Sequence, residues 1–287
     1  MTAVLLACAS AALFGAMSVA IRLALRDVSD AELGSFAMSS LALVLTAALG
    51  LAVSRGAGLR DAWPFLVAGA IAPGISQVLF VRAVRDAGAA RTSVLMGTAP
   101  LVAVAIALTI LGEPISAGLI AGGLLIVSGG IALANERVRP EDFRRLGVIF
   151  AVSATALFAV RDNVVRALSK GSDVPPLVAV PTSLLAAVAA VALYLAVTRR
   201  GAWLHGYGAA ARTFAPAALI FGLSYALLFE AYYHGRVSVV APLVATESLW
   251  GVAFAALFLR RSELVGRRLV AGAALIVAGG VLIGLSR

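Results

Sequence analysis

The sequence predicts an all-α polytopic membrane protein, and composition and patterning both support this fold class. Hydrophobic residues make up 62% of the 287 positions, charged residues make up 13%, and the mean hydropathy is +1.02. A soluble domain has roughly 45–50% apolar and about 25% charged residues. Apolar runs of about 20 residues, the length of a membrane-spanning helix, recur along the whole chain. Together these observations exclude a soluble enzyme, a disulfide-rich secreted domain and a disordered chain.

Ten apolar runs are long enough to span a bilayer, and polar loops separate them. They are Ala3–Leu25, Ala31–Val53, Trp63–Val84, Thr92–Leu111, Ile115–Ala134, Leu146–Leu168, Leu177–Thr198, Ala215–Tyr233, Val239–Leu259 and Leu264–Leu285. At about 20 residues each they occupy roughly 200 positions, so the loops are short and no extramembrane domain fits.

The net charge of +9 comes mainly from Arg residues that lie between the apolar runs, a placement that sets membrane topology. We therefore expect a lipid bilayer and no nucleic acid among the partners. Sixteen of the 23 Lys and Arg residues lie on the side of the loops that follow the odd-numbered runs. The positive-inside rule places that side in the cytoplasm and both termini outside.

The sequence offers no enzymatic or metal-binding motif. The single cysteine, Cys8, excludes an internal disulfide, and the two His residues lie in different runs or loops. Ser224 and His234 are ten residues apart in one run, about 15 Å along a helix, which is too far for a catalytic pair. A phosphate-binding P-loop is missing as well. We expect no catalytic residue, no metal and no cofactor.

Internal similarity indicates a duplication. GEPISAGLIAGGLLIVSGGIAL and SELVGRRLVAGAALIVAGGVLI align at an offset of 150 residues, and two further pairs align at offsets of 144 and 148. The alignment predicts a first five-helix repeat over 1–135, a linker over 136–145 and a second repeat over 146–287. Because five is odd, the second repeat is inverted in the membrane, an arrangement that places a solute site at the repeat interface near the midplane.

Three segments carry a resemblance to a known family: ALFGAMSVAIRLAL in the first run, TAPLVAVAIALTILGEP at Thr98–Pro114 and TESLWGVAFAALFLRRSE at Thr246–Glu263. They resemble the EamA-type repeat of the drug/metabolite transporter superfamily. In the second copy RRSE stands where the family has LGE, and Ser248 replaces the counterpart of Pro100.

The resemblance implies a ten-helix secondary transporter in a prokaryotic plasma membrane, often an exporter of amino acids, metabolites or drugs. Helices one to four and six to nine enclose the cavity in such proteins, and the fifth and tenth lie outside it. Relatives of this type usually keep both termini in the cytoplasm, which conflicts with the charge distribution.

Ionisable residues inside the runs are costly and therefore informative. Arg161 and Asp162 near the middle of the sixth run predict either a water-filled cavity or a structural ion pair. Glu247 in the ninth run is either a proton-coupling group or the salt-bridge partner of Arg161; Asp162 is the second proton-coupling candidate. The complete candidate solute-binding set is Phe14, Ser18, Gln77, Phe80, Arg161, Asp162, Asn163, Tyr225, Glu247 and Trp250.

Several other features leave alternatives open. Arg82 and Glu230 occupy matched positions and form either a gate ion pair or, as favoured for Arg82, interfacial snorkelling contacts; snorkelling is also favoured for Arg22 and Arg166. Interruptions of the runs are expected at Pro73-Gly74, Gly97, Pro100, Gly222 and Pro242, and they mark either cavity-facing helices or plain kinks. Small-residue spacing at Gly118/Gly122 and Gly280/Gly284 favours packing within the chain over a dimer face, and a monomer and a homodimer both remain open.

The sequence thus predicts a secondary transporter, an exporter of a small organic solute such as an amino acid or metabolite. It works by alternating access between inverted repeats, with proton coupling as an option. The alternative is a membrane scaffold or assembly partner that transports nothing.

Overall fold

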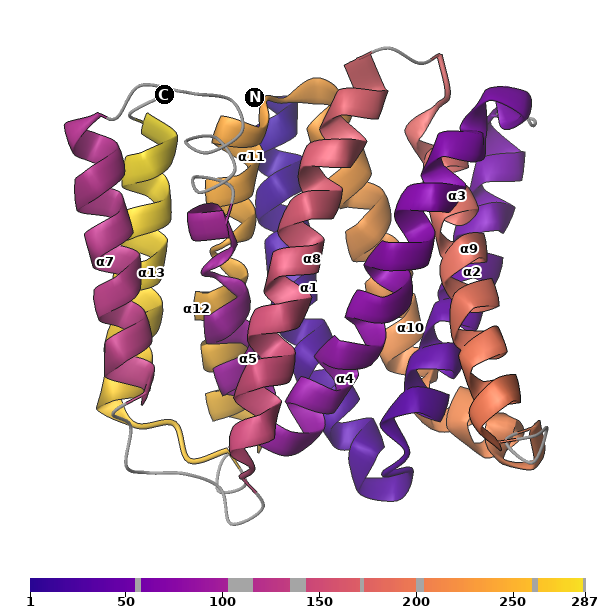
Figure 1. Cartoon of the computed structure of the whole chain (residues 1–287), viewed down its shortest axis with the longest axis horizontal. Helices are drawn as coiled ribbons and strands as arrows, with labels where there is room; N and C mark the ends of the chain where they lie inside the picture. The colour runs from indigo at the N-terminus through magenta and orange to yellow at the C-terminus, as the bar shows by residue number, and fades with distance from the viewer. Residues whose placement is uncertain are drawn as a thin grey trace.

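The computed structural model describes residues 1–54, 58–102, 116–134, 143–170, 173–199, 204–259 and 263–285. These residues form helices and no strand, which confirms the all-α class (Figure 1). The elements are α1 (Thr2–Asp27), α2 (Ala31–Ser54), η1 (Leu59–Ala62), α3 (Trp63–Gly69), η2 (Ala70–Ile75), α4 (Ser76–Ala87), α5 (Ala89–Met96), α7 (Ala117–Ala134), α8 (Arg145–Lys170), α9 (Pro176–Arg199), α10 (Leu204–His234), α11 (Val237–Val244), α12 (Glu247–Phe254), η3 (Ala255–Leu259) and α13 (Arg267–Leu285).

Within the described residues, eight segments are long and apolar enough to span a membrane, and each coincides with one of the ten predicted runs. α7 is equally apolar but shorter. The fourth predicted run, Thr92–Leu111, is described only as far as residue 102, and Glu113 lies outside the described residues. The predicted domain boundary at 135 and most of the 136–145 linker also lie outside them, so that division stays a prediction.

The contacts between helices recur when each helix is replaced by its counterpart from the other half. α1 packs along α10 while its counterpart α8 packs along α4; α2 packs along α9, α5 along α12, and α7 along α13. α1 ends, and α8 begins, near the end of α4, where the backbone N–H of Arg144 donates to the carbonyl oxygen of Asp86. The two counterpart helices therefore run in opposite directions, as the inverted repeat requires (Figure 1).

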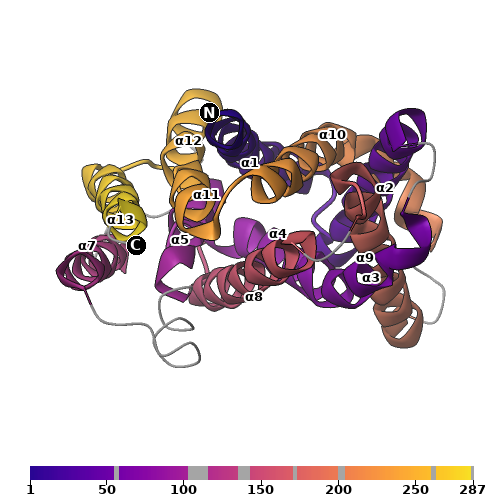
Figure 2. The ribbon, with the colours of Figure 1, turned by 90° about the horizontal axis from the view of Figure 1, so that it is seen from above.

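α7 and α13 form a pair at one side of the bundle, in contact with α5, α11 and α12 rather than with α2 or α9 (Figure 2). Their close approach depends on glycine. A Cβ on Gly129 would lie 2.6 Å from the carbonyl oxygen of Gly272, and one on Gly279 would lie 2.5 Å from that of Gly122. Small residues on these two helices thus serve packing within the chain.

Two membrane-spanning segments are interrupted, one at the predicted Pro73-Gly74 and one just after Pro242, which itself lies inside α11. The predicted break at Gly97 is confirmed, because α5 ends there. Ala72, directly before Pro73, has non-helical φ/ψ of −141° and 110° between α3 and α4. α11 and α12 meet at Ala245-Thr246, where the Thr246 N–H donates to Leu243 instead of continuing the α-helical pattern. The predicted break at Gly222 is wrong, because α10 runs without interruption through it and its buried face packs on α1 and α2.

Matched arginines bind helix ends inside the bundle. Arg22 Nη1 donates to the carbonyl oxygen of Arg85 at 2.8 Å, and Arg166 Nη1 donates to that of Tyr232 at 2.7 Å. These carbonyls close α4 and α10, where a cation also complements the helix dipole. Both arginines thus bind carbonyl oxygens within the protein, and snorkelling stays a prediction for them.

Glu263 holds the start of α5 at the same end as Arg22. Gly88, with φ +94°, brings the backbone so close that a Cβ there would lie 2.5 Å from the carboxylate. The Ala89 N–H donates to Glu263 at 2.8 Å, and Arg22 Nε lies 3.3 Å from the same carboxylate. Complete burial raises the pKa of the Glu263 carboxyl, against the opposing effect of these donors.

A second ionic cluster, formed by Asp30, Glu32, Arg82 and Arg199, joins the start of α2 to the ends of α4 and α9. Arg82 Nε donates to Glu32 at 2.5 Å, Arg199 Nη2 donates to Glu32 at 3.1 Å, and Arg199 also forms a salt bridge with Asp30. The hypothesis of an Arg82–Glu230 gate pair is wrong, because Glu230 pairs with His234 on its own helix at 3.4 Å.

Candidate functional site

A cavity of about 50 Å³ lies where helices of the two halves meet. It is lined by Phe14, Met17, Gln77, Phe80, Met96, Ala99, Phe158, Arg161, Asp162, Ala241, Val244, Ala245 and Glu247. α1, α4 and α5 contribute from the first half, and α8, α11 and α12 from the second. A water molecule needs roughly 10–15 Å³, so this space holds a few waters, and a larger solute requires the helices to separate.

Arg161 and Asp162 form a buried ion pair within α8, and both line the cavity. Arg161 Nε and Nη2 donate to Asp162 Oδ1 at 2.9 and 2.6 Å, and the two residues are 6% and 8% exposed. The guanidinium carbon lies 4.6 Å from the centre of the Phe158 ring and 5.1 Å from that of Tyr225. The sequence left open whether Arg161 and Asp162 line a cavity or form an ion pair, and in the structure they do both.

Glu247 begins α12, directly after the Ala245-Thr246 interruption, and reaches the cavity with 8% of its surface exposed. The predicted salt bridge to Arg161 is absent, because Arg161 pairs with Asp162. Within the part of the chain that the structure describes, the Glu247 carboxylate has no hydrogen bond or ion pair. A buried carboxylate without a counter-charge is costly, so a proton or a cation must balance it.

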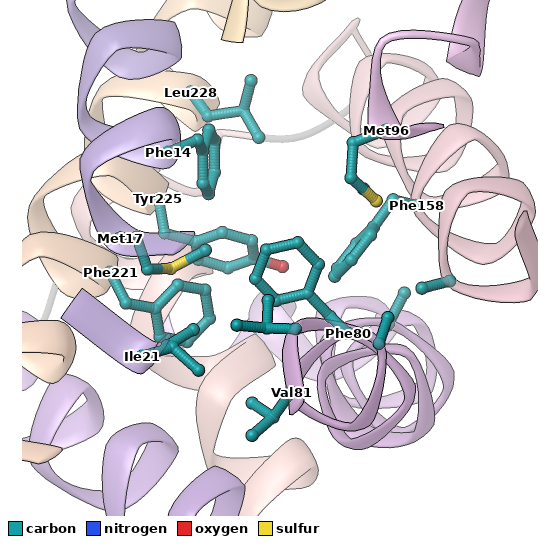
Figure 3. Close-up of a cluster of buried hydrophobic side chains, with 14 of the residues drawn as sticks. Phe14, Met17, Ile21, Phe80, Val81, Met96, Phe158, Phe221, Tyr225 and Leu228 are labelled. Carbon is teal, nitrogen blue, oxygen red and sulfur yellow. The ribbon is translucent and has the colours of Figure 1, made fainter. Parts of the chain in front are cut away.

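Gln77 completes the cavity wall together with three aromatic rings. Figure 3 shows these rings, which belong to Phe14, Phe80 and Phe158. The Phe80 and Phe158 rings meet edge to face with centroids 6.4 Å apart, and Phe14 lies across the cluster from Phe158. Gln77 is fully buried, and neither amide atom has a hydrogen-bond partner among the described residues. An unpaired buried amide costs about 1–3 kcal/mol, which a bound polar group would recover.

Four members of the predicted set do not line the cavity. Ser18 accepts a hydrogen bond from Ser93 at 2.9 Å, and Asn163 donates to the carbonyl oxygen of Ala159 at 2.9 Å. Tyr225 lies behind Arg161, and its ring contacts the guanidinium. Trp250 is 43% exposed and stacks on Phe254 at 5.6 Å, so it faces away from the cavity.

The sequence set also omitted seven lining residues, namely Met17, Met96, Ala99, Phe158, Ala241, Val244 and Ala245. Phe158 is an aromatic residue that the sequence offers for stacking on a solute, and the offset of 144 that aligns Arg22 with Arg166 also aligns Phe14 with Phe158. The other six are apolar side chains in apolar helices and carry no signal of their own.

The arrangement suits binding rather than catalysis. It offers one compensated cation, one carboxylate without a partner among the described residues, an amide and aromatic faces, all around one mainly apolar cavity. Among the described residues, no group of three or more His, Cys, Asp and Glu side chains is placed to hold a metal ion.

A comparison with solved structures finds a protein with a similar fold. A solved structure titled "Crystal structure of protein" is similar with a TM-score of 0.70 and 20% sequence identity, and the match covers 99% of this chain and 97% of that chain. At that identity the likeness establishes the fold. A search of curated proteins finds no match.

The family comparison concerns the first half of the chain. Residues 1–135, which contain α1 to α7, match the model of the EamA-like transporter family. The first half of the chain is therefore similar to the EamA-like transporter family.

Proposed function

We propose that the protein is a secondary transporter that exports a small organic solute, such as an amino acid or metabolite, by alternating access between the two repeats. One observation supports the proposal: charged and amide side chains line a cavity between the two halves, and they belong to helices that are apolar enough to span a membrane. Such residues in a membrane interior mark solute and ion pathways. The family resemblance supports the proposed export direction and the proposed location in a prokaryotic plasma membrane.

Glu247 and Asp162 are the candidates for proton coupling. Both carboxylates line the cavity, but only Asp162 has a cationic partner. Glu247 is therefore the carboxylate that can gain and lose a proton without breaking an ion pair. In the proposed cycle, its proton exchanges as the cavity opens to one side and then to the other.

The test is solute flux in proteoliposomes across a broad metabolite panel, with and without a pH gradient. We expect saturable flux that the pH gradient stimulates, and loss of that stimulation in Glu247→Gln. Glu230→Gln is the matched control, because Glu230 pairs with His234 near the end of α10, outside the cavity. Absence of saturable flux for every panel member would contradict the proposal and favour a non-transporting scaffold.

A further inference from the structure

The charges that line the cavity do not balance. The described lining contains one cation, Arg161, and two carboxylates, Asp162 and Glu247. Arg161 is bound twice to Asp162 and is covered by the Phe158 and Tyr225 rings. Its charge is therefore already compensated, and the ionised cavity retains one negative charge, on Glu247.

The neutral groups of the wall also favour a positive ligand. The faces of aromatic rings carry negative potential and attract ammonium groups, and Phe14, Phe80 and Phe158 all line this space. Gln77 is completely buried, and its carbonyl oxygen, which has no partner among the described residues, can accept a hydrogen bond from an N–H donor. Glu247 and Gln77 are thus two unsatisfied polar groups in one cavity, contributed by α12 and α4.

We propose that the transported solute is an organic cation, a protonated amine on an apolar or aromatic body, whose ammonium group binds the Glu247 carboxylate and the Gln77 carbonyl oxygen. This inference rests on the proposed transport function and narrows its substrate class. The apolar body would lie among the phenylalanine rings and the side chains of Met17 and Met96.

The same geometry makes proton and amine binding compete. The ionisable groups facing Glu247 are Arg161 and Asp162 of α8 and Tyr232 of α10. Because Asp162 is engaged by Arg161, Glu247 accepts the second positive charge. A neutral Glu247 carboxyl releases its proton when the ammonium binds, so one proton leaves for each amine that enters. Such an exchange would couple amine export to proton entry.

Three compounds with one aromatic body separate the charge classes: 2-phenylethylamine, phenylalanine and 3-phenylpropionate. Titration calorimetry of the purified full-length protein should show that the amine binds and that the zwitterion and the acid bind at least about tenfold more weakly, a difference of about 1.4 kcal/mol. Measurements with the wild-type protein in two buffers of different ionisation enthalpy should show about one proton released per bound amine near neutral pH.

Two variants locate the binding group. Glu247→Gln should weaken amine binding at least about thirtyfold, because it removes one partner of a buried charge pair. Gln77→Leu should weaken it less, and Glu230→Gln should leave it unchanged, since Glu230 lies outside the cavity lining. If Glu247→Gln fails to fold, the wild-type compound series and proton release still decide the question.

Tighter binding of phenylalanine or 3-phenylpropionate than of the amine would overturn the inference, as would binding of none of the three. Transport of an acid or a zwitterion in proteoliposomes would contradict the inference that the solute is an organic cation, but it would still support the proposed transport function. Absence of any flux would count against the transport function itself.

Discussion

Arg161 and Asp162 are adjacent in sequence, yet their side chains turn toward each other and enclose both charges in the bundle. Neutralising one member of such a pair leaves the other charge buried without compensation. Glu247 shows the opposite situation, because a single carboxylate faces the cavity and no described residue is paired with it. At the scale of the residue, the cavity is therefore lined by an ion pair, Arg161–Asp162, and by Glu247, a carboxylate that can take up and release a proton.

Asp162→Asn is expected to lower stability by about 3–5 kcal/mol, because it leaves the Arg161 charge buried without a partner. The thermal unfolding midpoint of the purified protein in detergent measures the effect. Glu230→Gln is the control, because Glu230 and His234 are partly exposed at 31% and 54%, and such pairs contribute about 0–1 kcal/mol. An unfolding midpoint of Asp162→Asn equal to that of the wild type would contradict a structural role for the pair.

Sequence reasoning located the polar cavity residues better than their apolar neighbours. Arg161, Asp162, Glu247 and Gln77 stand out because polar groups inside apolar runs need a physical reason. Trp250 was assigned to the site, but it faces outward. The direction of a side chain depends on the rotation of its helix about the axis, and a helix that is apolar all round gives no periodic signal of that rotation.

At the scale of the element, glycine and ion pairs decide how helices meet. Gly129 and Gly130 are neighbours in α7, but their surroundings differ. A Cβ on Gly129 would meet the Gly272 backbone of α13, whereas one on Gly130 would have no described atom within 4 Å. The sequence indicated small-residue packing for this pair of helices, but not which glycines form the contact.

Gly129→Ala is accordingly expected to lower the unfolding midpoint, because overpacking a tight backbone contact costs about 1–3 kcal/mol. Gly130→Ala is the matched control and should leave the midpoint unchanged or raise it, since alanine favours the helix by up to about 1 kcal/mol over glycine. Equal effects of the two substitutions would show that α7 and α13 do not pack through Gly129.

The Asp30–Glu32–Arg82–Arg199 cluster should make the stability of the protein depend on pH. Burial alone raises the pKa of the Asp30 carboxyl, but hydrogen bonds from Arg199 and from the Leu33 N–H outweigh it and leave the pKa below its ordinary value of 3.8. A carboxyl with a lowered pKa in the folded state contributes stability above its ordinary pKa, and this contribution is lost as the pH falls through the folded-state value.

We therefore expect the wild-type unfolding midpoint to fall as the pH decreases below about 4, and to fall less steeply in Asp30→Asn. Unfolding curves recorded over a pH series provide the measurement. Asp61→Asn, in the short helix η1 and outside the cluster, serves as the control. Identical slopes for Asp30→Asn and the wild type would show that the Asp30 contacts add no pH-dependent stability.

At the scale of the whole molecule, the duplicated sequence anticipated which helices are counterparts, but not which helices pack together. The offsets between matched segments placed α1 against α8 as counterparts, and the odd number of spans required their opposite directions. The contacts that join distant helices could not be predicted from the sequence. They depend on long-range ion pairs such as Arg22–Glu263, and no local sequence pattern indicates such pairs.

The orientation in the membrane has a direct test. The start of α1 and the end of α13 lie at the same side of the bundle (Figure 1). The positive-inside rule predicts both termini outside the cytoplasm. A reporter that fluoresces only in the cytoplasm, fused after Arg287, should stay dark, with an active periplasmic enzyme reporter at the same place as the positive control. Cytoplasmic fluorescence would show the orientation usual among relatives.

Alternating access at the central cavity is the central claim, and side-chain accessibility measures it most directly. Met17 is 3% exposed and lines the cavity, so Met17→Cys in a Cys8→Ser background places one thiol there. A membrane-impermeant maleimide is applied to right-side-out and to inside-out vesicles. The account predicts labelling from both sides, because the cavity opens to each in turn. Labelling from only one side, or from neither, at every pH and solute concentration tested would contradict it.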